Sequence, residues 1–181
     1  MACSSENKTT SSDSMSMDTT MSDTSGLDEN DSMTGTTTKV DEEAGNFMKM
    51  AAVGGMMEVE AGKLAQTNGS SQAVKDFGAK MVADHTAAGN ELMALASNNQ
   101  VMIPTSLPPA EQKHVDEMKK MSGKAFDAHY MGMMVNDHAK TVGMFRDATR
   151  SKHADVRAFA EKTLPTLEGH HTEAKKIKSS M

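Results

Sequence analysis

The sequence predicts an all-α fold, a four-helix bundle with a short extra helix in the crossover between the second and third long helices, preceded by a disordered N-terminal tail. Three observations predict it. From Asp41 onward, apolar residues recur at helical spacing. Glycine and proline interrupt that spacing at only a few places. Residues 1–40 differ, being rich in Ser and Thr without an aromatic residue, so we expect a tether over 1–40 and a bundle over 41–181.

The tail cannot bury enough apolar surface to offset the entropy of ordering it. Four of its methionines could offer thioether ligands to a soft ion such as Cu(I). This would make the tail a copper-capturing segment, but Met is common throughout the chain, with 19 in all, and we prefer that plainer interpretation. These four tail methionines are Met15, Met17, Met21 and Met33.

The first residues, Met-Ala-Cys-Ser-Ser, resemble the end of a bacterial lipoprotein signal, in which a small residue precedes the cysteine that receives the lipid. If an apolar signal segment absent from this sequence precedes them, Cys3 is a lipid anchor and the tail is a spacer. We then expect a lipid-anchored protein on the periplasmic side of the cell envelope. The alternative is a stray N-terminal cysteine in a cytosolic protein.

Charge and composition exclude some partners. The net charge of −6 and the absence of a Lys/Arg cluster argue against binding to nucleic acid. No stretch approaches the ~20 apolar residues of a membrane-spanning helix. We therefore expect membrane contact only through a lipid on Cys3. The sequence contains no motif that is typical of a particular reaction, which favours a protein that is not an enzyme. The sequence does not determine the oligomeric state.

The first hairpin is predicted from its capping signals and apolar faces. Residues 41–66 form the first helix, with Thr38 and Asp41 placed like a capping box and Asn68-Gly69 ending it. The second helix begins after Ser70-Ser71 and stops near residue 98. The residues expected to face inward are Phe47, Met50, Gly54, Met57, Ala61 and Leu64 on the first helix and Val74, Phe77, Met81, Val82, His85, Ala88, Leu92 and Leu95 on the second.

Three prolines, Pro104, Pro108 and Pro109, then impose a connector, and residues 110–121 form a short helix opened by the last of them. Ser122-Gly123 interrupts it, and the third long helix runs from there to about residue 150. The fourth follows Ser151 almost at once and contains Pro165, which should kink it. The expected inward residues are Tyr130, Met131, Met134, His138, Thr141, Val142 and Phe145, then Val156, Phe159, Ala160, Leu164, Leu167, His171, Ala174 and Ile177.

The motif Met-Val-x-Asp-His occurs twice, ending at His85 and at His138. At 100° per residue both histidines lie near the centre of an apolar face, whereas Asp84 and Asp137 lie at its edge. Neutral imidazole is a common metal ligand, and a neighbouring carboxylate can ligate too or orient the ring. The two Asp-His pairs predict a site for Fe, Mn, Zn or Cu. The plainer interpretation is that each histidine is buried, neutral and hydrogen-bonded within the core.

Topology decides whether the two motifs meet. If a continuous helix from residue 109 packed antiparallel to the second helix, the two histidines would lie about 24 Å apart along the axis. If residues 99–122 instead cross back along the bundle, the helices run parallel and both histidines lie at nearly equal depth. We prefer the crossover, because a helix over 109–150 would outrun its neighbours and contains Ser122-Gly123.

Other candidates fit one shared site less well. Counting residues outward from the turn between the first two helices places Glu58 at the level of Lys80. We therefore expect Glu58 to form an ion pair with Lys80 rather than to bind a metal. His170 and His171 lie about 9 Å along the axis from the level of His138, which suggests a second site or the end of the bundle. The histidines expected at the surface are His114, His129 and His153.

Several segments together resemble the ferritin-like bacterial family catalogued as domain of unknown function 4142, over about residues 43–178. The resemblance implies a ferritin-like four-helix bundle exported to the cell envelope. It does not identify an activity, because none is established for the family. By the same resemblance His170 is the family position, and His171 departs from a residue that is usually apolar. The segments are Gly-Gly-Met-Met-Glu-Val-Glu-Ala-Gly-Lys-Leu-Ala at 54–65, Met81–Thr86, Phe126-Asp127 with Tyr130-Met131, Met134–His138 and Thr163–His170.

From the sequence we therefore expect a metal-binding envelope protein. Its expected ligands are Asp84, His85, Asp137 and His138, with His170 or His171 as a further candidate. The competing hypothesis is a structural or interaction module whose helical surface binds another envelope component. In that case the histidines only stabilise the folded bundle and bind no metal.

Overall fold

The computed structural model describes residues 39–181, and this part of the chain holds five helices and no strand. The predicted all-α class is confirmed. The predictions for Cys3, the tail methionines and the capping role of Thr38 lie outside the described residues. The helices are α1 (Glu42–Asn68), α2 (Gln72–Asn98), α3 (Pro109–Met118), α4 (Gly123–Ala148) and α5 (Ala154–Ser179).

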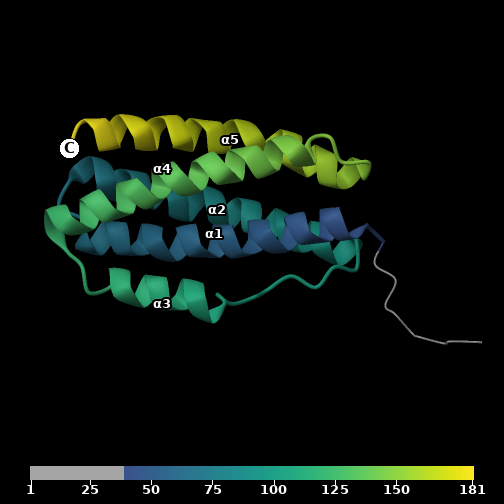
Figure 1. Cartoon of the computed structure of the whole chain (residues 1–181), viewed down its shortest axis with the longest axis horizontal. Helices are drawn as coiled ribbons and strands as arrows, with labels where there is room; N and C mark the ends of the chain where they lie inside the picture. The colour runs from purple at the N-terminus through teal and green to yellow at the C-terminus, as the bar shows by residue number, and fades with distance from the viewer. Residues whose placement is uncertain (1–38) are drawn as a thin grey trace, which may run out of the picture. The chain divides into compact units, whose positions relative to one another are not determined.

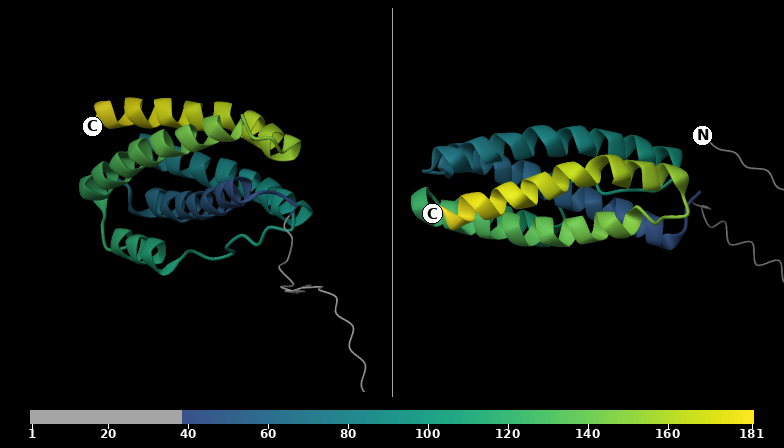
Figure 2. Two further views of the ribbon diagram at one scale, coloured as in Figure 1. Left: turned by 45° about the vertical axis from the view of Figure 1, so that its right-hand side comes forward. Right: turned by 90° about the horizontal axis from the view of Figure 1, so that it is seen from above.

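The four long helices form two antiparallel hairpins, α1 with α2 and α4 with α5, that pack side by side (Figure 1). Between the hairpins, α1 contacts α4 and α2 contacts α5. Residues 99–122 carry the chain back along the bundle, with α3 against α1, so that α2 and α4 run in the same direction (Figures 1 and 2). The predicted crossover is therefore present. None of these helices combines the length and apolar character needed to cross a bilayer.

The start of α1 is held by its own N-cap residue and by an ion pair with the link before α5. Asp41 is the N-cap of α1, where its carboxylate accepts the Ala44 N–H at 3.0 Å and pairs with Lys152 Nζ at 2.6 Å. Ordered packing begins before it, because Val40 is buried and the Lys39 N–H donates to the Asn99 carbonyl at 3.1 Å.

The start of α2 is capped from α4 rather than by its own N-cap side chain. Ser71 makes no side-chain capping bond. Instead the buried Asp127 carboxylate accepts the N–H of Ser70 at 3.0 Å, the N–H of Ser71 at 2.9 Å and the Ser70 hydroxyl at 2.5 Å. The cap thus joins the two hairpins at one end of the bundle.

Two apolar clusters divide the core along the bundle axis. The first contains three mutually packed phenylalanines, Phe47, Phe145 and Phe159. The second gathers Phe77 and Tyr130 with several buried methionines. Both clusters draw residues from all four long helices, and on each helix the sequence passes from one cluster to the other near its middle.

The inward faces of α2 and α4 largely match the prediction, but that of α1 does not. Met50, expected inside, is 61% exposed. The buried face of α1 consists mostly of small residues, which do not stand out in an apolar pattern. They let α1 approach α2 closely: a Cβ on Gly62 would lie 2.7 Å from the Gly78 carbonyl oxygen. Further along the chain, α5 continues as one helix through Pro165.

Candidate metal centre

One polar residue from each long helix lies between the two apolar clusters. Glu58 comes from α1, His85 from α2, His138 from α4 and His170 from α5, with exposures of 4%, 8%, 0% and 1%. The three imidazoles are mutual neighbours, with ring centroids 5.7, 5.5 and 5.4 Å apart. Each offers one potential ligand atom, and these atoms all lie within 4.8 Å of one another. Three buried histidines that could hold a metal ion thus meet at the centre of the bundle.

Each ring has one nitrogen with a close oxygen partner. His138 Nδ1 lies 3.0 Å from the Met134 carbonyl oxygen, and His170 Nε2 lies 2.7 Å from Asp84 Oδ2. Because those oxygens accept, they place the ring protons on these two nitrogens. The Glu58 carboxyl group lies between His85 and His138, with Oε2 3.1 Å from His85 Nδ1 and Oε1 3.3 Å from His138 Nδ1.

The opposite nitrogen of each ring is buried and has no hydrogen-bond partner among the described residues. These atoms are His85 Nε2, His138 Nε2 and His170 Nδ1. Buried polar atoms in folded proteins are nearly always paired, so three orphaned nitrogens in one cluster require an explanation. On His138 and His170 the orphaned nitrogen carries the lone pair, which is the form that binds a metal.

Burial keeps the cluster uncharged at neutral pH. Desolvation, with smaller contributions from neighbouring histidines, lowers the pKa of His85 to about 3 and of His138 to about 4. It also lowers the pKa of His170, although hydrogen bonding to Asp84 opposes that shift. Desolvation and then the charge of Asp137 raise the pKa of Glu58 to about 8. The imidazoles of His85 and His138 therefore stay in their ligating form well below pH 7, and Glu58 holds its proton unless positive charge is placed nearby.

A sequence profile of the family described as "Domain of unknown function (DUF4142)" matches residues 29–177. The chain belongs to the DUF4142 family. Among solved structures it is similar to the "Crystal structure of DUF305 fragment from Deinococcus radiodurans", with a TM-score of 0.68 and 9% identity over 78% of this chain and 98% of that one. At that identity the likeness concerns the fold alone. No curated protein matches the chain.

In this DUF4142 bundle the expected ion pair between Glu58 and Lys80 is wrong. Lys80 instead binds Glu173 at 2.7 Å, and Glu58 lies inside beside His85. Gly62 of α1 lies against Gly78 of α2, which places Glu58 only about two residues from the level that the count gave it, and its side chain contacts His85 rather than Lys80. The signal that was missed is the spacing of Glu58, which lies three residues before Ala61 on the small-residue face of α1.

The placement of the fourth helix also needed correction. His170 is the buried histidine, whereas His171, expected inside, is half-buried. The expected offset of about 9 Å along the axis does not keep the two side chains apart, because the ring centroids of His138 and His170 are 5.4 Å apart. A count of residues along the axis leaves out the reach of the two side chains and the crossing of the helices.

The two aspartates of the repeated motif have different surroundings. Asp84 contacts His170, as described above. Asp137 pairs with Lys140 at 3.5 Å and lines a different hollow, beside α3. The structure thus brings together Asp84, His85, His138 and His170 of the predicted residues, adds Glu58, and leaves Asp137 and His171 outside the direct contacts of the cluster.

We had expected the remaining histidines to be isolated residues at the surface, but each of them contacts another residue. His114 and His129 are half-buried and stacked on each other, and His153 lies 3.3 Å from Asp41 Oδ2. Their partners come from elements distant in the sequence, which helical periodicity alone does not reveal.

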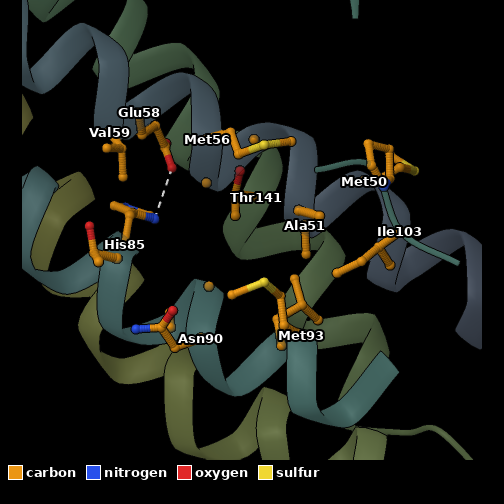
Figure 3. A pocket seen from close by; sticks show the side chains of 18 of the residues that line it. Met50, Ala51, Met56, Glu58, Val59, His85, Asn90, Met93, Ile103 and Thr141 are labelled. Atoms are coloured by element: carbon orange, nitrogen blue, oxygen red, sulfur yellow. Dashed lines mark ion pairs between the residues drawn. The ribbon is translucent and has the colours of Figure 1, made fainter. Parts of the chain in front are cut away.

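A cavity of about 540 Å³ reaches the cluster from one side. In Figure 3 Glu58 and His85 lie at one end of it and Met50 and Ile103 at the other, with Met56 and Met93 between them. Most of its wall is apolar, and polar side chains line it both beside Glu58 and His85 and from the crossover, where Thr105, Ser106 and Gln112 contribute. The crossover supplies part of this wall through Ile103–Leu107 and Gln112. The cluster is therefore buried yet adjacent to space that a small molecule could enter.

Proposed function

We propose that this DUF4142 chain binds one first-row transition metal ion through His85, His138 and His170. The observation that carries the proposal is the set of three buried, unpartnered ring nitrogens on imidazoles whose ligand atoms lie within 4.8 Å of one another. Leaving such groups unpaired costs roughly 1–3 kcal/mol each. A metal ion would satisfy all three at once.

The carboxylates supply the outer layer of this centre. Metal-bound histidines usually donate their other N–H to a carboxylate or a carbonyl, which fixes the ring orientation and increases ligand basicity. Asp84 fits this role for His170, the Met134 carbonyl for His138 and Glu58 for His85. A bound cation would favour the ionised form of Glu58, which can then accept the His85 Nδ1–H.

Three imidazoles suit Fe, Zn or Cu better than Mg or Ca, which prefer oxygen ligands. Three protein ligands also leave a coordination position for water or another ligand, as in catalytic zinc sites. The cavity beside His85 gives that position a route to small molecules with an apolar body and one donor group. The proposed activity is therefore metal binding with one exchangeable position.

Metal analysis of the purified, untagged chain tests this function. After reconstitution with Fe, Mn, Zn and Cu in turn and removal of excess metal, we expect the wild type to retain one equivalent that a His85→Ala/His138→Ala variant loses. His171→Ala is the matched control, because it removes an imidazole next to His170 that lies outside the cluster. A single His170→Gln variant, checked for helix content by circular dichroism, guards against loss by unfolding. If the wild type and His170→Gln retain equal metal, the proposal is wrong.

We also propose where in the cell this protein lies. The Met-Ala-Cys start and the family resemblance support a lipid-anchored protein on the periplasmic side of the envelope, with the tail as spacer. Mass spectrometry of the native full-length product tests it. A diacylglycerol on Cys3 is expected, and an unmodified thiol there would rule out the anchor.

A second candidate function, copper capture by the Met-rich tail, depends on Met15, Met17, Met21 and Met33. Deleting residues 4–40 would abolish Cu(I) binding if the tail captures copper. The same deletion would leave the central equivalent unchanged if the bundle is the metal site.

A further inference from the structure

A pair of histidines joins the crossover helix to the bundle, away from the central cluster. His114 lies on α3 and His129 on α4, and their Nε2 atoms are 3.4 Å apart. The rings stack with centroids 5.3 Å apart and an interplanar angle of 29°. Both rings are half-buried and line one hollow beside α3.

The separation of these two nitrogens suits a tetrahedral metal. Zn–N bonds are about 2.0–2.1 Å long, so an ion bound to both nitrogens at their present separation would form an N–metal–N angle of about 110°. Without an ion, a hydrogen bond between the rings requires one of them to donate to the other. An ion would instead use both lone pairs.

Other potential ligands line the same hollow. Glu111 lies one turn before His114 on α3 and lines the same hollow, as do Met57 and Met133. Its carboxylate makes no ion pair or hydrogen bond within residues 39–181, whereas Asp137 is already paired with Lys140. The spacing Glu111-x-x-His114 places a carboxylate and an imidazole on one helix face.

We propose that His114 and His129 form a second, peripheral site for a divalent transition metal such as Zn²⁺, with Glu111 as an additional carboxylate. The ion fastens α3 to α4. It also restrains the crossover, whose residues 103–107 form part of the wall of the central cavity. This site stands on its own residues and does not depend on the central centre.

Zinc titration of the untagged, full-length, chelator-treated chain tests the proposal. By isothermal calorimetry and elemental analysis, we expect one Zn²⁺ equivalent to disappear in His114→Ala/His129→Ala, while His153→Ala, the matched control, keeps the wild-type stoichiometry. His129→Gln, which retains a polar side chain of similar size, should lose the same equivalent. If the central centre alone fails, the wild type still binds the equivalent that these variants lose.

Amide hydrogen exchange distinguishes an ion that bridges His114 and His129 from an ion that binds only one of them. Adding Zn²⁺ should slow amide exchange across Pro109–Met118 in the wild type and in His170→Gln, but not in His129→Gln. Equal Zn²⁺ binding by the wild type and His114→Ala/His129→Ala would overturn the site. Binding that leaves exchange in α3 unchanged would overturn the proposed fastening of α3 to α4.

Discussion

At the scale of single residues, the repeated Met-Val-x-Asp-His motif shows that identical local sequence acquires different roles from its neighbours. Asp84 meets His170 of α5, whereas Asp137 faces Lys140 on its own helix. The orientation of the two histidines follows from periodicity, but the partner of each aspartate depends on which helix packs against it. The two aspartates therefore provide a matched pair for experiments.

Replacing Asp84 by Asn should weaken metal binding about 10- to 100-fold, because the variant loses the charged partner that orients His170. Competition titration against a chromophoric chelator measures the change. Asp137→Asn, the same substitution in the same motif, should have a much smaller effect. Equal losses in both variants would show that Asp84 has no particular role.

The buried titratable groups predict a stability maximum near pH 6.5 for the metal-free protein. Below pH 6.5 the unfolded chain protonates histidines that the folded protein keeps neutral until about pH 4 for His138 and about 3 for His85, so stability falls with pH. Above pH 6.5 the folded protein retains the Glu58 proton up to about pH 8, although the unfolded chain has lost it above about 4.5. Stability therefore falls again as the pH rises.

Urea unfolding followed by circular dichroism across this range checks both limbs. In Glu58→Gln the decline between pH 6.5 and 8 should vanish and the acid limb should remain. A decline of unchanged size in that variant would assign the alkaline limb to another group.

At the scale of elements, α2 depends on α4 at both its start and its middle. The Asp127 cap joins the two hairpins, and its carboxylate accepts from three donors in the link before α2. Asp127→Ala should lower the free energy of unfolding by about 3 kcal/mol, because it leaves backbone N–H groups unpaired. Chemical denaturation measures it. Asp76→Ala, in the first turns of α2 but exposed, should change stability by less than about 0.5 kcal/mol.

The register of the α1–α2 hairpin depends on the close approach at Gly62 and Gly78. A Cβ on Gly78 would lie 2.7 Å from Ala65 Cβ and 2.8 Å from the Gly62 carbonyl oxygen. Gly78→Ala should therefore destabilise the protein by about 1–3 kcal/mol and weaken metal binding by displacing Glu58 from His85. Gly89→Ala on the same helix meets nothing within 4 Å and should stabilise by about 0.5–1 kcal/mol. Denaturation of the two variants side by side compares them.

At the scale of the whole described part of the chain, a polar layer separates two apolar cores. Metal binding to that layer should raise stability by about 2.7 kcal/mol when free metal exceeds its dissociation constant a hundredfold. Thermal unfolding of His114→Ala/His129→Ala, with and without Zn²⁺, measures the central contribution alone. Adding His170→Gln to that background should remove the Zn²⁺-dependent increase, whereas adding His171→Gln should not.

Much of this architecture could be predicted from the sequence. Large apolar residues mark the inward faces of α2 and α4, and Ser122-Gly123 with the prolines marks the crossover. The two histidines of the repeated motif were oriented correctly for the same reason. The face of α1 was not, because its buried residues are mostly small and resemble surface alanines and glycines.

The rest of the site depended on how the helices pack against one another, which composition does not encode. One helical turn is about 5.4 Å, enough to separate Glu58 from His85 or His170 from His138 in a count along the axis. Which side chains meet also depends on how closely the helices approach and on how far each side chain extends along the bundle. Both are properties of the folded packing rather than of any one segment.

The distribution of the three histidines over two hairpins also has a kinetic consequence. The first hairpin brings His85, and the second brings His138 and His170, so neither holds the complete set. An ion can engage all three only after the hairpins have docked. Its stabilisation should therefore appear as slower unfolding of the metal-loaded protein, with the rate of refolding little changed.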